Sequence, residues 1–499
     1  MRTRKTLINL FFNFIQQLVG IITNFILPPL LISNFGSSFN GLISTIRQMM
    51  TYAQLTGAGI SQSSTYALYE PLYKKDYITI SGIYNATNKM FVKAGNYFSL
   101  IVLLLSLVYP FFVKDIDRMT VIFLVIIIGI SGISEFYVYG KYQTIVNANQ
   151  NNYIIALTQA IGNIANIIIT IILIALNANI IIVQLGASII YLMRIIILKW
   201  YVDIHYPYLN NSVKPMFNKI TQRNNAIIHQ LAGLIVYSSS TIIVSLICGL
   251  KSASVYTVYA LVFNGLDTIC SMISTAVYAS FGEIISQREQ KLLITNFNLF
   301  ECIYFCFTAI IYVVTFLMIM PFIDVYTSGM TDTNYHLPIL AFLFVLVGIA
   351  NNIRVPARTL VNAAGHFKQT QNRAIIEMVL CIVGQIIFSF TFGINGVLLG
   401  CLMSYSYRTI DFVIYSNKYI VKISSFNSFK RVIIYVLFGI LFILCFNKIF
   451  VVKTQSYYAW FAWAICITFA VSIYFLFITF IFDKQSIKKS INILRSFFQ

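Results

Sequence analysis

The sequence predicts an all-α polytopic membrane protein, built from two six-helix lobes related by an internal repeat and two further C-terminal helices. Hydrophobic residues make up 59% of the 499 residues and charged residues only 10%, and the mean hydropathy is +0.81. Apolar runs of about twenty residues, the length that spans a bilayer as a helix, recur along the whole chain. Several short fragments also recur at a nearly constant offset, which is typical of a duplication.

The net charge of +19 raises the question of a nucleic-acid partner. Most of the basic residues, however, fall in loops on the side of the N-terminus, as the positive-inside rule expects. The sequence therefore predicts cytoplasmic N- and C-termini and no nucleic-acid partner. The first apolar segment continues to Leu31 without a small-residue cleavage site, so it is a spanning helix and not a signal peptide.

The apolar runs predict about fourteen spanning helices. We place them at 7–33, 40–66, 89–112, 119–141, 153–176, 180–200, 226–248, 253–281, 297–320, 337–363, 373–392, 395–416, 431–449 and 457–482. Outer connections at 177–179 and 393–395 are short enough to be tight turns. The domain prediction is an N-terminal lobe (1–205), a cytoplasmic linker (206–225), a C-terminal lobe (226–420), and two further helices with a basic tail (421–499).

Four fragments support the repeat because they recur in order at offsets of 211 to 215 positions. They pair Val146-Asn147-Ala148 with Val361-Asn362-Ala363, Tyr191 and Arg194 with Tyr405 and Arg408, Gly186 with Gly400, and Pro110-Phe111 with Pro321-Phe322. A duplication of six helices keeps both copies in the same membrane orientation, so an axis along the membrane normal should relate them. This is transporter architecture, with an expected cavity between the lobes and alternating access.

Arg354 and Arg358 lie within the predicted span 337–363 and share one helix face because they are four residues apart. Pro356 between them removes a backbone donor and predicts a kink. Charged residues inside a membrane usually face a water-filled cavity or a partner. The two arginines therefore predict the wall of an anion-accepting cavity; the alternative is that they extend to the lipid headgroups.

Two further arginines are candidates for the same cationic cavity. Arg47 lies inside the predicted span 40–66 with no acidic residue within one helical turn. Arg194 and Arg408 occupy matching repeat positions, but Arg408 has Asp411 three residues on and is expected to pair with it. The candidate substrate-binding residues are therefore Arg47, Arg354, Arg358 and Arg194.

Among the intramembrane acids, Asp267 and Glu301 have no local cation. Each could be a protonatable site that couples transport to an H⁺ or Na⁺ gradient, or the partner of an arginine, because intramembrane acids serve both purposes. Glu377 lies four residues after Arg373 and is expected to pair with it.

No enzymatic activity is expected. The chain contains no GxxxxGK[ST], HExxH, GxSxG or GxGxxG pattern, and its outer loops are short. The eight cysteines and four histidines show no metal-ligand spacing. The sequence therefore predicts neither a metal site nor a cofactor.

Three blocks carry a resemblance to a known family: Phe35 to Tyr77 (FGSSFNGLISTIRQMMTYAQLTGAGISQSSTYALYEPLYKKDY), Ser254 to Ile269 (SVYTVYALVFNGLDTI), and the stretch from Tyr326 to Glu377. They resemble polysaccharide repeat-unit flippases of the Wzx type, within the superfamily that also holds multidrug/toxin extruders and lipid II flippases. The likeness runs through nearly the whole chain.

The resemblance implies a flippase of the bacterial inner membrane that carries undecaprenyl-pyrophosphate-linked oligosaccharides for capsule, O-antigen or exopolysaccharide synthesis. The expected partners are this lipid-linked substrate, the bilayer, and possible polysaccharide polymerases and glycosyltransferases. The family's cationic cavity implies anion-binding roles for Arg47, Arg354 and Arg358. By resemblance to lipid II flippases, helices 13 and 14 imply a groove for the lipid tail.

One position departs from the family pattern: relatives often have an aspartate about where Thr241 stands, which leaves the coupling mechanism open. The main alternative function is export of drugs or small molecules by the same superfamily. A membrane-embedded glycan polymerase or ligase and a scaffold of an assembly complex are further alternatives.

Overall fold

The computed structural model describes residues 2–484 except 221–223, 451, 453 and 455. Every regular element in these ranges is a helix, and the chain divides into two compact units, Met1–Thr257 and Val258–Gln499. This division falls inside α10 (Leu250–Ser286), whereas the sequence places the linker at 206–225. The predicted lobes 1–205 and 226–420 are the two proposed copies of the repeat, and they stay predictions.

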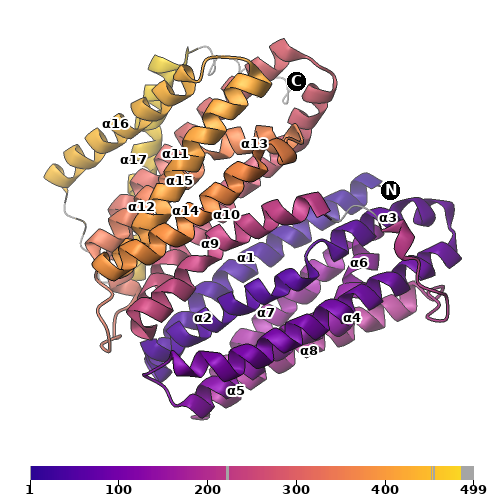
Figure 1. Cartoon of the computed structure of the whole chain (residues 1–499). Helices are drawn as coiled ribbons and strands as arrows, with labels where there is room; N and C mark the ends of the chain where they lie inside the picture. The colour runs from indigo at the N-terminus through magenta and orange to yellow at the C-terminus, as the bar shows by residue number, and fades with distance from the viewer. Residues whose placement is uncertain (1, 221–223, 451, 453, 455, 485–499) are drawn as a thin grey trace. The chain divides into compact units, whose positions relative to one another are not determined.

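Unit 1 holds the helices labelled from α1 to α9 in Figure 1, together with the start of α10. Their bounds are α1 Arg2–Phe35, α2 Ser37–Ala53, η1 Gln54–Gly57, α3 Ile60–Lys74, α4 Tyr77–Val108, η2 Tyr109–Phe111, α5 Arg118–Ser134, η3 Glu135–Tyr139, α6 Gly140–Ala148, α7 Asn152–Ala175, α8 Ile180–His205, η4 Phe217–Lys219 and α9 Asn224–Cys248. Two of its predicted spans contain breaks that shape the interior.

The first break divides the predicted span 40–66. α2 ends at Ala53, a 3₁₀ turn follows, and α3 begins after Gly59, which adopts the left-handed conformation with φ of 76°. The prediction of one continuous helix here was wrong, because glycine permits this conformation and lets the chain change direction. A Cβ atom at Gly57 would lie 2.2 Å from the Phe136 ring, so the turn packs closely on the next helix.

The second break interrupts the predicted span 119–141 at Glu135–Tyr139, which form a π-helical turn between α5 and α6. Such single turns within α-helices frequently occur at functional sites. The break places Glu135 and Phe136 at the same level as Gly57 of the first break. Unit 1 therefore has a broken helix at α2–α3 that packs against a π-helical turn within the continuous helix 118–148.

Unit 2 holds the remaining helices. Their bounds are α11 Gln290–Tyr326, α12 Pro338–Ile353, α13 Val355–Ala363, α14 Phe367–Phe392, α15 Ile394–Tyr415, η5 Ser416–Val421, α16 Phe426–Ile449 and α17 Tyr457–Phe482. The predicted kink at Pro356 is confirmed: α12 ends at Ile353, and α13 begins with Pro356 in its first turn, where no donor is needed. The predicted turn at 393–395 is confirmed as well, with Gly393 at φ of 57° joining α14 to α15.

Twelve helices in the described part are long and apolar enough to cross a membrane. Two of the predicted spans are not among them. The span 40–66 is interrupted as described above, and the described apolar part of 226–248 is the shorter segment Gly233–Cys248. The all-α, multi-span fold class predicted from composition is confirmed.

Candidate functional site

The break between α12 and α13 carries a polar cluster into the interior of unit 2. Arg354 lies at this break and is only 6% exposed. Its guanidinium donates to the Glu377 carboxylate on α14 and to Oδ1 of Asn351, the latter at 2.6 Å from Nη2. It also lies over the Tyr405 ring, 4.5 Å from the ring centroid. These contacts compensate the cost of burying the charged guanidinium of Arg354.

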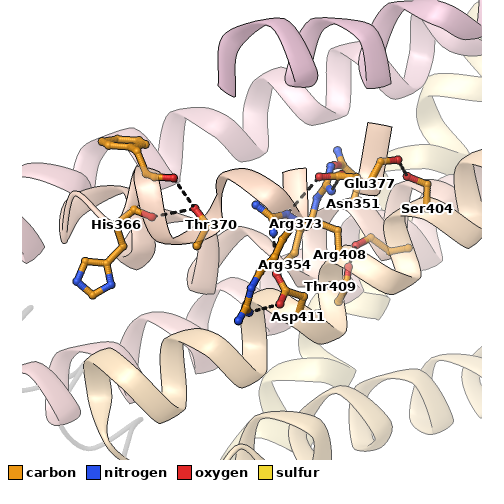
Figure 2. Close-up of polar contacts among 12 residues, drawn as sticks. Asn351, Arg354, His366, Thr370, Arg373, Glu377, Ser404, Arg408, Thr409 and Asp411 are labelled. Atoms are coloured by element: carbon orange, nitrogen blue, oxygen red, sulfur yellow. Dashed lines mark hydrogen bonds and ion pairs between the residues drawn. The ribbon is translucent and has the colours of Figure 1, made fainter. Parts of the chain in front are cut away.

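Figure 2 shows that Glu377 extends this contact into a chain of ion pairs joining α14 to α15. Its second carboxylate oxygen lies 3.2 Å from Nε of Arg408, and Arg408 Nη1 donates to Asp411 at 2.6 Å. Asp411 also accepts from Arg373. The chain therefore holds three arginines against two carboxylates, an excess of one positive charge.

Asp267, on α10, takes part in a second network, which Asn351 links to Arg354. It accepts from Asn352 Nδ2 at 2.8 Å and from Asn351 Nδ2 at 3.1 Å. Asn352 also donates to the Tyr312 hydroxyl and accepts from the Tyr304 hydroxyl, each at 2.8 Å. In the described part of the chain Asp267 forms no ion pair, so its half-buried carboxylate is held by amides alone.

Arg358, one turn after Arg354, is half-buried, and its side chain makes no hydrogen bond or ion pair with the described residues. Asp267, Tyr304 and Glu377 lie near enough to act on it electrostatically. The two arginines that share a helix face in the sequence therefore differ in the structure. Arg354 is neutralised by Glu377, and Arg358 keeps its donors available.

Glu301, predicted as a candidate ion-coupling site, is paired. It is 1% exposed on α11, and its carboxylate accepts from Arg431 Nη1 of α16 at 2.9 Å. Arg431 in turn donates to both oxygens of Asp483, after α17, at 2.9 and 3.0 Å. This three-residue bridge ties α16 and the end of α17 to α11, a contact between helices that no local spacing could reveal.

In unit 1, Arg194 is partnered by neutral groups. Its Nη2 donates to Oδ1 of Asn163 at 2.6 Å and to the Gln159 carbonyl at 3.3 Å, and its guanidinium lies 4.4 Å from the Tyr191 ring centroid. Arg194, Gln159 and Tyr191 line a small cavity of about 90 Å³ together with Glu135. Arg194 therefore faces a polar cavity, as a ligand-binding arginine would.

Arg47 lies on α2, is exposed, and makes no side-chain hydrogen bond or ion pair with the described residues of its unit. The anion-binding roles predicted for Arg47 and for the other candidate arginines stay predictions.

The internal repeat reappears in the contacts. Arg194 bonds Asn163, and 214 positions later Arg408 pairs with Glu377, so matching residues of both copies make matching contacts. The breaks match too: α6 and α13, nine residues each, end at the repeated Asn-Ala pairs Asn147-Ala148 and Asn362-Ala363.

Local spacing predicted some of these pairs and not others. The Arg408–Asp411 pair, three residues apart on one helix, is confirmed. The expected Glu377–Arg373 pair is wrong: Glu377 bonds Arg354 and Arg408, and Arg373 bonds Asp411. Arg431 and Glu135 were not among the predicted site residues; the available signal for Glu135 was an acidic residue within the predicted span 119–141.

No protein-family model matches the sequence, and no curated protein does. Solved structures do. An inward-facing multidrug resistance MATE family transporter of the MOP superfamily has a TM-score of 0.63 and 15% identity, covering 83% of this chain and 98% of that one. The lipid II flippase MurJ, in an inward closed conformation, has a TM-score of 0.61 and 17% identity, covering 95% and 99%.

A Vibrio cholerae MATE transporter in a bent form is similar as well, with a TM-score of 0.52 and 14% identity, covering 83% of this chain and 98% of that one. Likenesses at such low identity establish the fold alone. This chain has the multi-helix membrane fold found in MATE transporters and in MurJ.

Proposed function

We propose that this protein is a flippase that moves undecaprenyl-pyrophosphate-linked oligosaccharide repeat units across the bacterial cytoplasmic membrane by alternating access. The observation that carries the proposal is Arg358, an arginine within a spanning segment that no described carboxylate pairs. Burying an unpaired cation is costly, so such a residue usually serves a ligand or an ion path. The fold shared with a lipid II flippase supports the same reading.

The chemistry of the cargo explains why arginine suits this place. The prenyl tail is as apolar as lipid and can remain in the bilayer, whereas the pyrophosphate needs a cationic path. A guanidinium binds phosphate oxygens through two parallel hydrogen bonds, which a lysine ammonium cannot do. Arg47, exposed on α2, and Arg194 are proposed to serve the same anionic cargo.

The tail itself has a candidate place in unit 2. An apolar cavity of about 430 Å³ lies among α11, α12 and α16, lined by side chains such as Phe305, Phe342 and Ile440. The sequence resemblance pointed to helices 13 and 14, which correspond to α16 and α17. Only the first of these contributes to the cavity lining.

A second candidate function is export of a small cation. It is favoured by Asp267, whose carboxylate has amide partners but no ion pair in the described part of the chain. The same residue is our proposal for H⁺ or Na⁺ coupling, in place of the aspartate that relatives carry near position 241. Glu301 is a weaker candidate because Arg431 already neutralises it.

The test is complementation of a strain that lacks its own repeat-unit flippase, with the glycan genes that neighbour this gene co-expressed. Wild type is expected to restore surface polysaccharide. Arg358→Ala is expected to lose most of that activity when it is present in the membrane in the same amount as wild type. The reason is that the substitution removes the guanidinium that binds the pyrophosphate. Arg358→Lys should rescue only partly, since it keeps the charge without the paired donors.

Arg288→Ala is the matched control, because Arg288 lies in the short connection between α10 and α11. Full activity of Arg358→Ala would overturn the assigned role of Arg358 and leave the flippase standing. Absence of rescue by wild type, together with resistance to cationic dyes that depends on Asp267, would favour the exporter. Glycosyltransferases and a polysaccharide polymerase are proposed as partners only if wild type restores surface polysaccharide.

A further inference from the structure

Unit 1 contains a polar cavity of about 340 Å³ that the proposed cationic path does not use. The two irregular segments form it: η1 supplies Gln54, the first turn of α3 supplies Gln62, and η3 and α6 supply Glu135 and Gln143. Phe91 and Phe136 contribute aromatic surface. Its volume lies at the lower end of the range for small-molecule sites, about 300–1,000 Å³.

The packing that opens this cavity is specific. A Cβ atom at Gly57 would lie 2.2 Å from the Phe136 ring, and one at Gly140 would lie 2.7 Å from the Phe91 ring. Both glycines therefore permit a close approach between the segments that line the cavity.

Five lining residues carry uncharged hydrogen-bonding side chains: Thr51, Gln54, Ser61, Gln62 and Gln143. Gln62 and Gln143 make no side-chain hydrogen bond with the described residues, and Gln54 makes one long contact of 3.4 Å, from its Nε2 to Glu135. A primary amide offers two donors and an acceptor with two lone pairs. Sugar hydroxyls are donors and acceptors at once, so three amides around one cavity match them well.

The one carboxylate of this cavity is electrostatically balanced. Glu135 also lines the neighbouring small cavity that contains Arg194, and Arg194 acts on it electrostatically. The region around the amides is therefore close to neutral overall, unlike the arginine-rich cluster of unit 2. A neutral, amide-lined site favours an uncharged ligand over a pyrophosphate or a drug cation.

We propose that this cavity, defined by Gln54, Gln62, Glu135 and Gln143, binds one uncharged sugar of the cargo, a hexose or an N-acetylhexosamine. This inference rests on the proposed flippase function and adds a site that recognises the glycan separately from its pyrophosphate. Glu135 accepts from a sugar hydroxyl, the glutamines donate to and accept from others, and the phenylalanines contact the apolar ring face.

The experiment measures binding to the full-length protein in lipid nanodiscs with two kinds of probe. One is undecaprenyl pyrophosphate without sugar; the other is the same lipid carrying a single glucose, galactose, N-acetylglucosamine or N-acetylgalactosamine. Wild type should bind at least one sugar-bearing lipid about three- to tenfold more tightly than the sugar-free lipid, as expected for one or two added hydrogen bonds.

The double variant Gln54→Ala/Gln143→Ala should lose this increment and keep its affinity for the sugar-free lipid. Gln287→Ala, which removes an exposed glutamine at the end of α10, is the matched control and should behave as wild type. Equal thermal unfolding temperatures would show that both variants fold.

Four results would overturn the proposal. A wild type that binds the sugar-free lipid but prefers none of the sugars lacks the subsite, although the flippase stands. A double variant that keeps the full increment places the sugar elsewhere. Binding of tetraphenylphosphonium that Glu135→Gln abolishes makes the cavity a cation site. If wild type binds no prenyl pyrophosphate at all, the proposed function fails together with the subsite.

Discussion

The two copies of the repeat place an arginine at the same position and give it different partners. In unit 1, Arg194 donates to the amide of Asn163 at 2.6 Å; in unit 2, Arg408 pairs with the carboxylate of Glu377 at 3.2 Å. The helices involved, α7 with α8 and α14 with α15, correspond in the repeat. Both copies therefore have the arginine contact between these helices, but the partner is a neutral amide in unit 1 and a carboxylate in unit 2.

This difference indicates a structural role for the ion-pair cluster around Glu377 in unit 2 and leaves the polar groups around Arg194 in unit 1 beside a cavity. In unit 2 the carboxylate gathers Arg354 and Arg408 into a buried ion chain, which leaves Arg358 as the available cation. In unit 1 the neutral amide of Asn163 binds Arg194, and Glu135 lines the cavity beside Arg194 without forming an ion pair in the described part of the chain. The comparison teaches that an intramembrane charge indicates function only after its partners are known.

The largest expected effect comes from removing the carboxylate that distinguishes the two clusters. Glu377→Ala leaves Arg354 and Arg408 buried without their shared counter-charge, and breaking a buried ion pair in this way costs about 3–5 kcal/mol. We expect a marked fall in the thermal unfolding temperature of the purified protein in detergent, or failure to accumulate in the membrane.

The matched variant in unit 1 is Asn163→Ala, which removes one hydrogen bond to Arg194 and should cost about 1 kcal/mol. Glu377→Gln keeps the shape and should fall between the two. Equal stability of Glu377→Ala and Asn163→Ala would contradict the assignment of unit 2 as the structural cluster.

An intermediate effect is expected at the repeated glycines, Gly186 and Gly400. A Cβ atom at Gly400 would lie 2.2 Å from the backbone nitrogen of Gln385, whereas one at Gly186 would meet side chains, a Leu173 methyl at 2.7 Å and Cγ1 of Ile169 at 3.4 Å. Backbone cannot yield as a flexible side chain does, so Gly400→Ala should destabilise by about 1–3 kcal/mol. Gly186→Ala should cost clearly less, as measured by the same thermal unfolding. The reverse order would show that the two helix hairpins do not pack as described.

The smallest effect on stability is expected at Glu135, the acid that lines the cavities of unit 1. Glu135→Gln should change the free energy of unfolding by less than about 0.5 kcal/mol, as substitutions that disturb no buried pair usually do. The reason is that its side-chain hydrogen bond within the described part of the chain is one long contact with Gln54, which a glutamine can keep. Thermal unfolding of Glu135→Gln beside Glu377→Gln makes the comparison direct. A loss as large as that of Glu377→Gln would make Glu135 a structural acid.

Features that depend on a few neighbouring residues were predictable. Pro356 ended a helix because proline lacks an amide hydrogen, and Arg408 met Asp411 because residues three apart share a helix face. Arg354 and Arg358 were correctly placed together inside one span, but the free side chain of Arg358 and the paired one of Arg354 were not distinguishable. The partner Glu377 lies on another helix, 23 positions away from Arg354.

The sequence by itself determined that the chain is a bundle of membrane-spanning helices in two related copies. Hydropathy is a property of windows of about twenty residues, and a repeat is visible as an offset. Only the tertiary structure decided which charges neutralise one another, where α2 and α3 separate, and that Glu135 lines a polar cavity. These depend on how each helix is rotated against its neighbours, and ion pairs form only when packing brings their atoms to within about 4 Å.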